Sequence, residues 1–132
     1  MILLTASAGC KTTTNLTTAP TPSNQQQIEI VSVFGPLKPI NPGGPIIEIT
    51  LKNIGSEPVI SLSATIELNK SFVFSYDVTA LNPLLTGKTV SVKLSLIGAG
   101  YDDSLYYPLT INGTIQNGVT FIYTNQVRIG AK

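Results

Sequence analysis

The chain has 132 residues, of which 42% are hydrophobic and only 11% are charged, and this length suffices for one domain with its own core. Eight basic and seven acidic residues leave a net charge of +1, which excludes the strongly basic surface that nucleic-acid binding requires. Histidine and tryptophan are absent and there is one cysteine, so no intramolecular disulfide can form and the commonest general base and zinc ligand are missing. No apolar run reaches the roughly 18 residues that a membrane-spanning helix needs.

The first ten residues run from apolar through small side chains to a cysteine, in the order MILLTASAGC. Ala8, Gly9 and Cys10 resemble the end of a bacterial lipoprotein signal peptide, in which the cysteine is lipidated and becomes the mature N-terminus. Ser7 stands where that family usually has an aliphatic residue, and no Lys or Arg precedes Cys10. The resemblance implies a lipid anchor on Cys10 and a signal that starts further upstream. The alternative is an accidental match, with Cys10 a free cysteine that is buried or disordered.

Residues 11–27 consist of Thr, Pro, Asn and Gln with almost no large apolar side chain, in the order KTTTNLTTAPTPSNQQQ. Such a segment buries too little surface to offset the entropy of ordering it, so the sequence predicts a flexible tether. A tether directly after a lipidation site would hold a folded domain away from a membrane. The expected organisation is therefore a signal and lipidation segment at 1–10, a tether at 11–27 and a folded domain at 28–132.

The folded domain is expected to consist of β-strands, because apolar and polar side chains alternate in it with a period of two. The first strand has Ile28, Ile30 and Phe34 on one face and Val31 and Val33 on the other, followed by a Pro- and Gly-rich loop or kinked edge segment at 35–45. Later strands begin near residues 46, 59, 72, 89, 107 and 119.

Turn residues separate these strands at regular intervals. A turn is expected between Asn53 and Pro58, where Gly55 interrupts pairing, and another at Thr86-Gly87. Asn117-Gly118 lies between two alternating segments and predicts a hairpin with a type I′ turn.

About seven strands without a convincing helix predict an all-β fold, a single sandwich of antiparallel strands. The segments PIIEITLKNIGSEPV and NPLLTGKTVSVKLSL, followed by a terminal hairpin, resemble immunoglobulin-like modules of prokaryotic cell-surface proteins. This resemblance covers residues 28–129 and implies a fold and a compartment, but no catalytic or binding residue. The predicted core contains Ile47, Ile49, Leu51, Leu62, Ile66, Phe74, Val92, Leu94, Leu109, Ile111 and Phe121.

Catalytic chemistry is not expected from this sequence. No serine lies in a Gly-X-Ser-X-Gly motif, and Glu48 and Glu67 lie on the polar phase of their strands. Asp102 and Asp103 offer only two carboxylates, too few for a calcium site, so a polar turn is the better interpretation. The sequence predicts no enzyme, no cofactor and no metal site.

Two kinds of candidate site are left. Tyr101, Asp102, Asp103 and Tyr106 form a candidate contact loop, since tyrosine is favoured at interfaces, whereas Tyr107 and Tyr123 have the phase of core residues. Sequons for N-glycosylation occur at Asn15, Asn69 and Asn112.

These features predict a non-catalytic lipoprotein, secreted to the cell envelope or cell surface and anchored to the membrane, whose domain serves adhesion or binds proteins or glycans. Self-association is a further expectation. The alternative is a structural subunit of an extracellular filament, in which residues 1–8 complete the sandwich of the next subunit as an exchanged strand. A third interpretation is a partner domain for a larger surface enzyme or transporter, which the sequence does not separate from the first.

Overall fold

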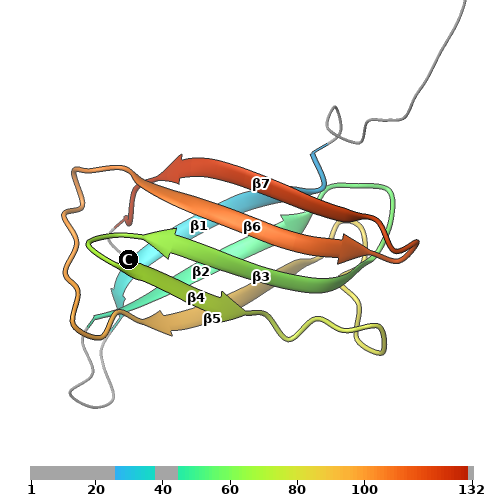
Figure 1. Cartoon of the computed structure of the whole chain (residues 1–132), viewed down its shortest axis with the longest axis horizontal. Helices are drawn as coiled ribbons and strands as arrows, with labels where there is room; N and C mark the ends of the chain where they lie inside the picture. The colour runs from blue at the N-terminus through green and yellow to red at the C-terminus, as the bar shows by residue number, and fades with distance from the viewer. Residues whose placement is uncertain (1–25, 38–44, 131–132) are drawn as a thin grey trace, which may run out of the picture.

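Seven β-strands follow one another in the part of the chain that this computed structural model describes, residues 26–37 and 45–130, and that part contains no helix (Figure 1). The strands are β1 (Ile28–Leu37), β2 (Ile46–Asn53), β3 (Val59–Glu67), β4 (Ser71–Ser75), β5 (Thr89–Ser95), β6 (Tyr107–Ile115) and β7 (Thr120–Val127). Cys10, the sequon at Asn15 and the segment expected to exchange as a strand lie outside the described residues.

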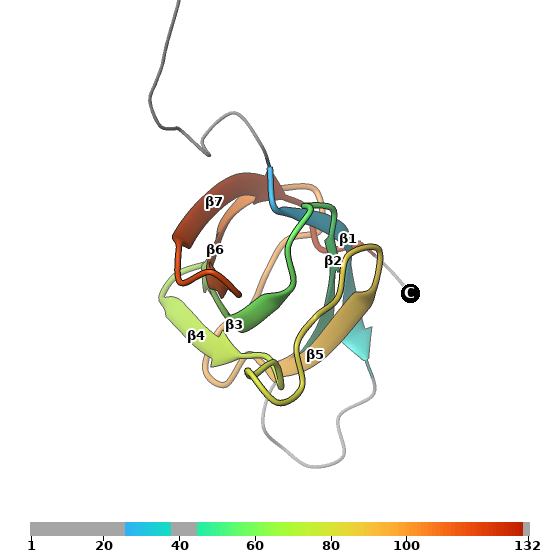
Figure 2. The same cartoon turned by 90° about the vertical axis from the view of Figure 1, so that its right-hand side faces the viewer.

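The strands form two sheets that face each other across one core (Figure 2). One sheet has the order β1-β2-β5 and the other the order β4-β3-β6-β7, and every neighbouring pair of strands is antiparallel. The predicted all-β sandwich of about seven antiparallel strands is therefore confirmed. In the constant-type immunoglobulin order the fourth strand joins the sheet of the first, second and fifth strands, whereas here β4 pairs with β3.

The side chains that the alternation predicted to face inward form the core or pack against it. Predicted core residues that are buried are Ile47, Ile49, Leu51, Leu62, Ile66, Leu109 and Ile111. Those that are only partly buried but pack against the core are Phe74, Val92, Leu94 and Phe121. The second group lies entirely on β4, β5 and β7, which are edge strands, so each of these side chains has a neighbouring strand on one side only.

Register shifts in β1 and β3 change the face that residues present. In β1 the register shifts between Ile30 and Ser32, so that Val33 is 7% exposed while Val31 is 50% exposed. The expectation that Phe34 shares the inner face with Ile28, and that Val33 lies opposite, is therefore wrong. A bulge adds one residue to one strand and inverts the alternation beyond it. A shift in β3, between Val59 and Ser61, buries Val59, which the alternation placed on the polar face.

The hairpin between β6 and β7 has a different turn from the predicted one. The backbone N–H of Gly118 donates to the carbonyl of Ile115 at 2.9 Å, which closes a turn centred on Gln116 and Asn117. Gly118 has a φ of +92°. A type I′ turn would centre on Asn117 and Gly118, so the structure shows a three-residue loop with Gly118 in the left-handed region instead.

Asn53, at the end of β2, is the one polar residue that is fully buried among the described residues. Its side-chain amide donates to the carbonyls of Glu57 (2.8 Å) and Leu84 (2.9 Å), and its oxygen accepts from Gln27 (2.7 Å) and from the backbone N–H of Gly55 (2.9 Å). The amide group thereby uses its two donors and two acceptor positions. It joins the start of β1, the β2–β3 turn and the β4–β5 loop at one end of the sandwich.

Candidate functional site

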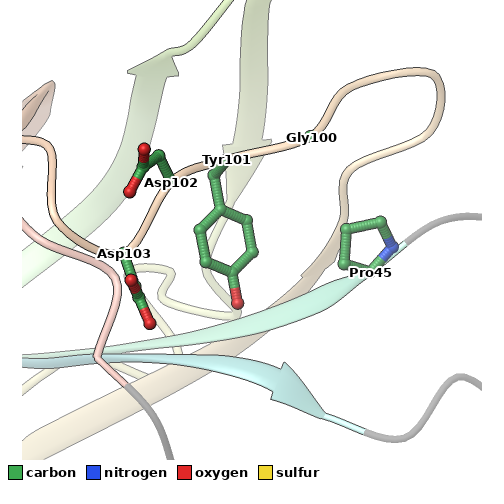
Figure 3. A pocket seen from close by; sticks show the side chains of 5 residues that line it. All are labelled: Pro45, Gly100, Tyr101, Asp102 and Asp103. Atoms are coloured by element: carbon green, nitrogen blue, oxygen red, sulfur yellow. The ribbon is translucent and has the colours of Figure 1, made fainter.

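The β5–β6 corner, residues 96–106, lies at the end of the sandwich away from Asn53 and carries the predicted contact loop. An open hollow of about 580 Å³ is lined by Pro45, Gly100, Tyr101, Asp102 and Asp103. Figure 3 shows Tyr101 directed from the corner toward β1 and β2, with Pro45 on one side and Asp103 on the other. Three of the four residues predicted for the contact loop thus line one hollow.

The corner is held in shape by three hydrogen bonds that involve Asp102. The backbone N–H of Asp102 donates to the hydroxyl of Tyr107, the first residue of β6, at 2.7 Å. The carboxylate of Asp102 accepts from the backbone N–H of Ser104 at 2.8 Å and from its hydroxyl at 2.6 Å. This local turn occupies the carboxylate, which supports the prediction of a polar turn at this position.

These contacts change the acidity of two side chains. The hydrogen bonds from the hydroxyl and the backbone of Ser104 hold the pKa of the Asp102 carboxyl below its ordinary value, because they stabilise the charged form. Burial raises the pKa of the Tyr101 hydroxyl, and the nearby negative charge of Asp103 raises it further. Asp102 is thus ionised and Tyr101 neutral at physiological pH.

A glycine on β1 provides room for Tyr101. A Cβ at Gly35 would lie 3.0 Å from the Tyr101 hydroxyl and 2.7 Å from a methyl carbon of Ile47. A larger residue at position 35 would therefore displace the tyrosine that forms the floor of the hollow.

Arg128, just after β7, also belongs to this corner, and the sequence analysis did not identify it. Its Nε donates to the carbonyl of Asp103 at 3.1 Å, and its guanidinium lies 5.8 Å from the centre of the Tyr106 ring. The predicted contact residue Tyr106 is 62% exposed and does not line the hollow, while Leu105 beside it is 52% exposed. No sequence signal links Arg128 to this loop, because only the fold brings residues this far apart together.

The remaining predicted sites are dispersed. Asn69 is exposed in the β3–β4 turn, whereas Asn112 lies within β6, partly buried and paired with Ser63 and Ile122. Tyr107 and Tyr123 are partly buried and pack against the core, as their phase indicated. The β3–β4 turn that carries Asn69 lies beside the corner, since the Nζ of the next residue, Lys70, is 2.8 Å from the position that a Cβ would take at Gly98, whereas Asn112 lies within the sheet.

Within residues 26–37 and 45–130, no three His, Cys, Asp or Glu side chains are grouped so that they could hold a metal ion. The same part of the chain has no helix with the length and apolar character needed to cross a bilayer. The features that the corner does offer are exposed aromatic and aliphatic side chains beside carboxylates and one arginine.

The fold thus defines the described chain as a two-sheet antiparallel β-sandwich with an aromatic and acidic corner at one end. No protein-family model matches the sequence, and no curated protein matches it either.

Proposed function

We propose that this chain is a non-catalytic binding module of the cell envelope, anchored through a lipid on Cys10, and that its β5–β6 corner contacts a protein or glycan partner. One observation carries the binding role: the corner is held in a defined shape while its large side chains are exposed. Hydrogen bonds from Asp102 to Tyr107 and from Arg128 to Asp103 hold the loop, and Tyr106 is 62% exposed beside them.

A loop that is already ordered loses little conformational entropy when a partner binds, so more of its contact energy appears as affinity. Tyrosine and arginine are the residue types enriched in the central contacts of interfaces. Tyr106 stacked against Arg128 provides such a pair, and Leu105 adds apolar surface next to it.

The anchor is supported by the order of segments in the sequence. Cys10 follows Ala8 and Gly9, and residues 11–27 then separate it from the first strand at Ile28. Fully extended, this tether would span about 60 Å. That reach is enough to hold the domain outside a bilayer while the corner contacts a partner.

Two measurements test the two parts of the proposal. Mass spectrometry of the N-terminus of protein isolated from its native membranes should find a diacylglyceryl adduct on Cys10. An unmodified Cys10 in membrane-derived protein would contradict the anchor.

For the corner, binding of the wild-type domain is compared with that of Tyr106→Ser on a glycan array and on purified surface proteins. The matched control is Ile122→Ser, since Ile122 is 73% exposed on the outer face of the β4-β3-β6-β7 sheet. We expect Tyr106→Ser to weaken binding by about 1–2 kcal/mol, roughly 5- to 30-fold, and Ile122→Ser to leave it unchanged. Equal binding by both variants would exclude the corner as the contact surface.

A further inference from the structure

The end of the sandwich opposite the β5–β6 corner is also the end from which the chain leaves toward Cys10. The backbone N–H of Ile54 donates to the carbonyl of Gln27 at 3.0 Å, which places the last described residues before β1 beside the β2–β3 turn. The N–H of Gln116 donates to the carbonyl of Pro58 at 2.9 Å, so the β6–β7 hairpin lies at this end too. Figure 2 views this end directly, with the β4–β5 loop on the same face. We refer to Gln27, Ile54, residues 77–88 and residues 116–119 as the tether end.

The tether end exposes several apolar side chains. Leu81 is 99% exposed, Leu85 49%, Ile54 43% and Val119 42%. Residues 78–87, with the sequence VTALNPLLTG, contain no charged side chain, and Asp77 and Lys88 flank them. The opposite end also exposes Ile97, Leu105 and Tyr106, but there they lie in a loop that carries the charged residues Asp102 and Asp103, with Arg128 bound to it.

The exposure of Leu81 is fixed by its turn. The backbone N–H groups of Thr79 and Asn82 each donate to the carbonyl of the other residue at 3.1 Å, and the amide of Asn82 donates to the carbonyl of Asp77 at 3.1 Å. Leu84 in the same loop is 5% exposed and pairs with Val59 through two backbone hydrogen bonds. The loop is thus anchored at Leu84 and presents Leu81 to the outside.

We propose that the tether end rests on the surface of a lipid bilayer, with Leu81 and Leu85 inserted among the lipid headgroups. This inference rests on the proposed function, because it requires the chain to be held at a membrane. The tether joins the domain at Gln27, so this end lies nearest to the anchor along the chain, whereas the corner lies at the far end of the strands. Transfer of apolar side chains to the headgroup boundary is favourable, and because Asp77 and Lys88 carry opposite charges, apolar contact rather than charge supplies the binding.

A few side chains of this kind bind a bilayer weakly when the protein is free in solution. A lipid anchor changes that, because contact becomes intramolecular and occurs at a high effective concentration. The contact would also orient the molecule, since a sandwich standing on its tether end presents the β5–β6 corner to the outside.

The absence of tryptophan and the single cysteine allow a direct test with the full chain. Cys10 is coupled to a maleimide-bearing lipid in vesicles with anionic headgroups, which supplies an anchor whether or not Cys10 is lipidated in the cell. Leu81→Trp provides one fluorophore at the tether end, and Tyr106→Trp provides the matched control at the opposite end. Both replaced side chains are exposed, so both variants should fold like the wild type.

We expect the emission of Leu81→Trp to shift to shorter wavelength on vesicle coupling and to be quenched by brominated lipids, with neither change in Tyr106→Trp. Solvent-like, unquenched emission from coupled Leu81→Trp would overturn the inference, as would equal quenching of both variants. A concentration-dependent shift of Leu81→Trp without lipid would assign the surface to a second copy of the chain and would also overturn it. Failure of native lipidation is detected separately by the mass of the N-terminus.

Discussion

The hydroxyl of Tyr107 accepts a 2.7 Å hydrogen bond from the backbone N–H of Asp102, five residues earlier in the chain. This contact closes the crossing from one sheet to the other, because β5 belongs to the β1-β2-β5 sheet and β6 to the β4-β3-β6-β7 sheet. A tyrosine at the start of the sixth strand that bonds back to the preceding loop is a feature of immunoglobulin-like sandwiches, known as the tyrosine corner. In this chain the same contact shapes the surface that we propose for binding.

Replacing Tyr107 by Phe should destabilise the domain by about 1 kcal/mol, because it removes one hydrogen bond but keeps the ring against the core. Urea unfolding followed by circular dichroism measures the change. The matched control is Tyr106→Phe, whose ring is largely exposed and which should leave the midpoint unchanged. Equal midpoints for both variants would show that the corner does not depend on Tyr107.

Asn53→Ala should destabilise the domain by about 3 kcal/mol or more. The change removes four hydrogen bonds made by a fully buried side chain, although the carbonyls of Glu57 and Leu84 keep a second donor each, from Gln27 and from the backbone of Val59. Asn69→Ala, at an exposed turn, is the control and should change stability by less than about 0.5 kcal/mol. Similar unfolding free energies for the two variants would contradict the structural role of Asn53.

Replacing a large core side chain by alanine should reduce the free energy of unfolding more on a central strand than on an edge strand. Leu109→Ala on β6 should cost about 2–5 kcal/mol, because Leu109 is fully buried. Leu94→Ala on the edge strand β5 should lower the free energy of unfolding by less. Leu94 is only partly buried, so its removal takes away less buried apolar surface. Chemical denaturation of both variants checks the order, and a larger loss at Leu94 would contradict it.

The carboxyl of Asp102 should titrate below the ordinary range of an aspartate, and Ser104→Ala should raise its pKa. Since the pKa is lower in the folded than in the unfolded chain, the Asp102–Ser104 contact stabilises the fold above the unfolded value of about 3.9. That contribution is lost as the pH falls through the folded pKa. The chemical shift of the Asp102 carboxyl carbon, recorded against pH, gives this pKa in the wild type and in Ser104→Ala. Identical titration curves would exclude the contact in solution.

Cys10→Ala should release the protein from membranes and leave the domain folded. The described strands begin at Ile28, and all the buried core residues among the described residues lie at Ile28 or later in the chain. Membrane fractionation combined with circular dichroism of the released protein tests both halves. A wild-type protein that is already released would exclude the anchor, and an unfolded variant would favour the filament subunit that exchanges an N-terminal strand.

Much of the fold could be predicted because alternation along one strand is a local property. Ile47, Ile49 and Leu51 face the core on β2 as the period of two required, and the turn expected after Asn53 is present. The candidate contact loop was also found locally, since Tyr101, Asp102 and Asp103 are neighbours in the chain and line one hollow.

The sequence by itself therefore determined the number of strands, the residues that supply the core and the loop that carries aromatic and acidic side chains. Only the tertiary structure decided which strands are edges, and hence that Leu94 and Phe121 are half-buried rather than buried. It also decided the bulge that turns Val33 inward and the approach of Arg128 to Tyr106. These features depend on which distant segments pair with each other, and the alternation of side chains within one segment does not show its partner.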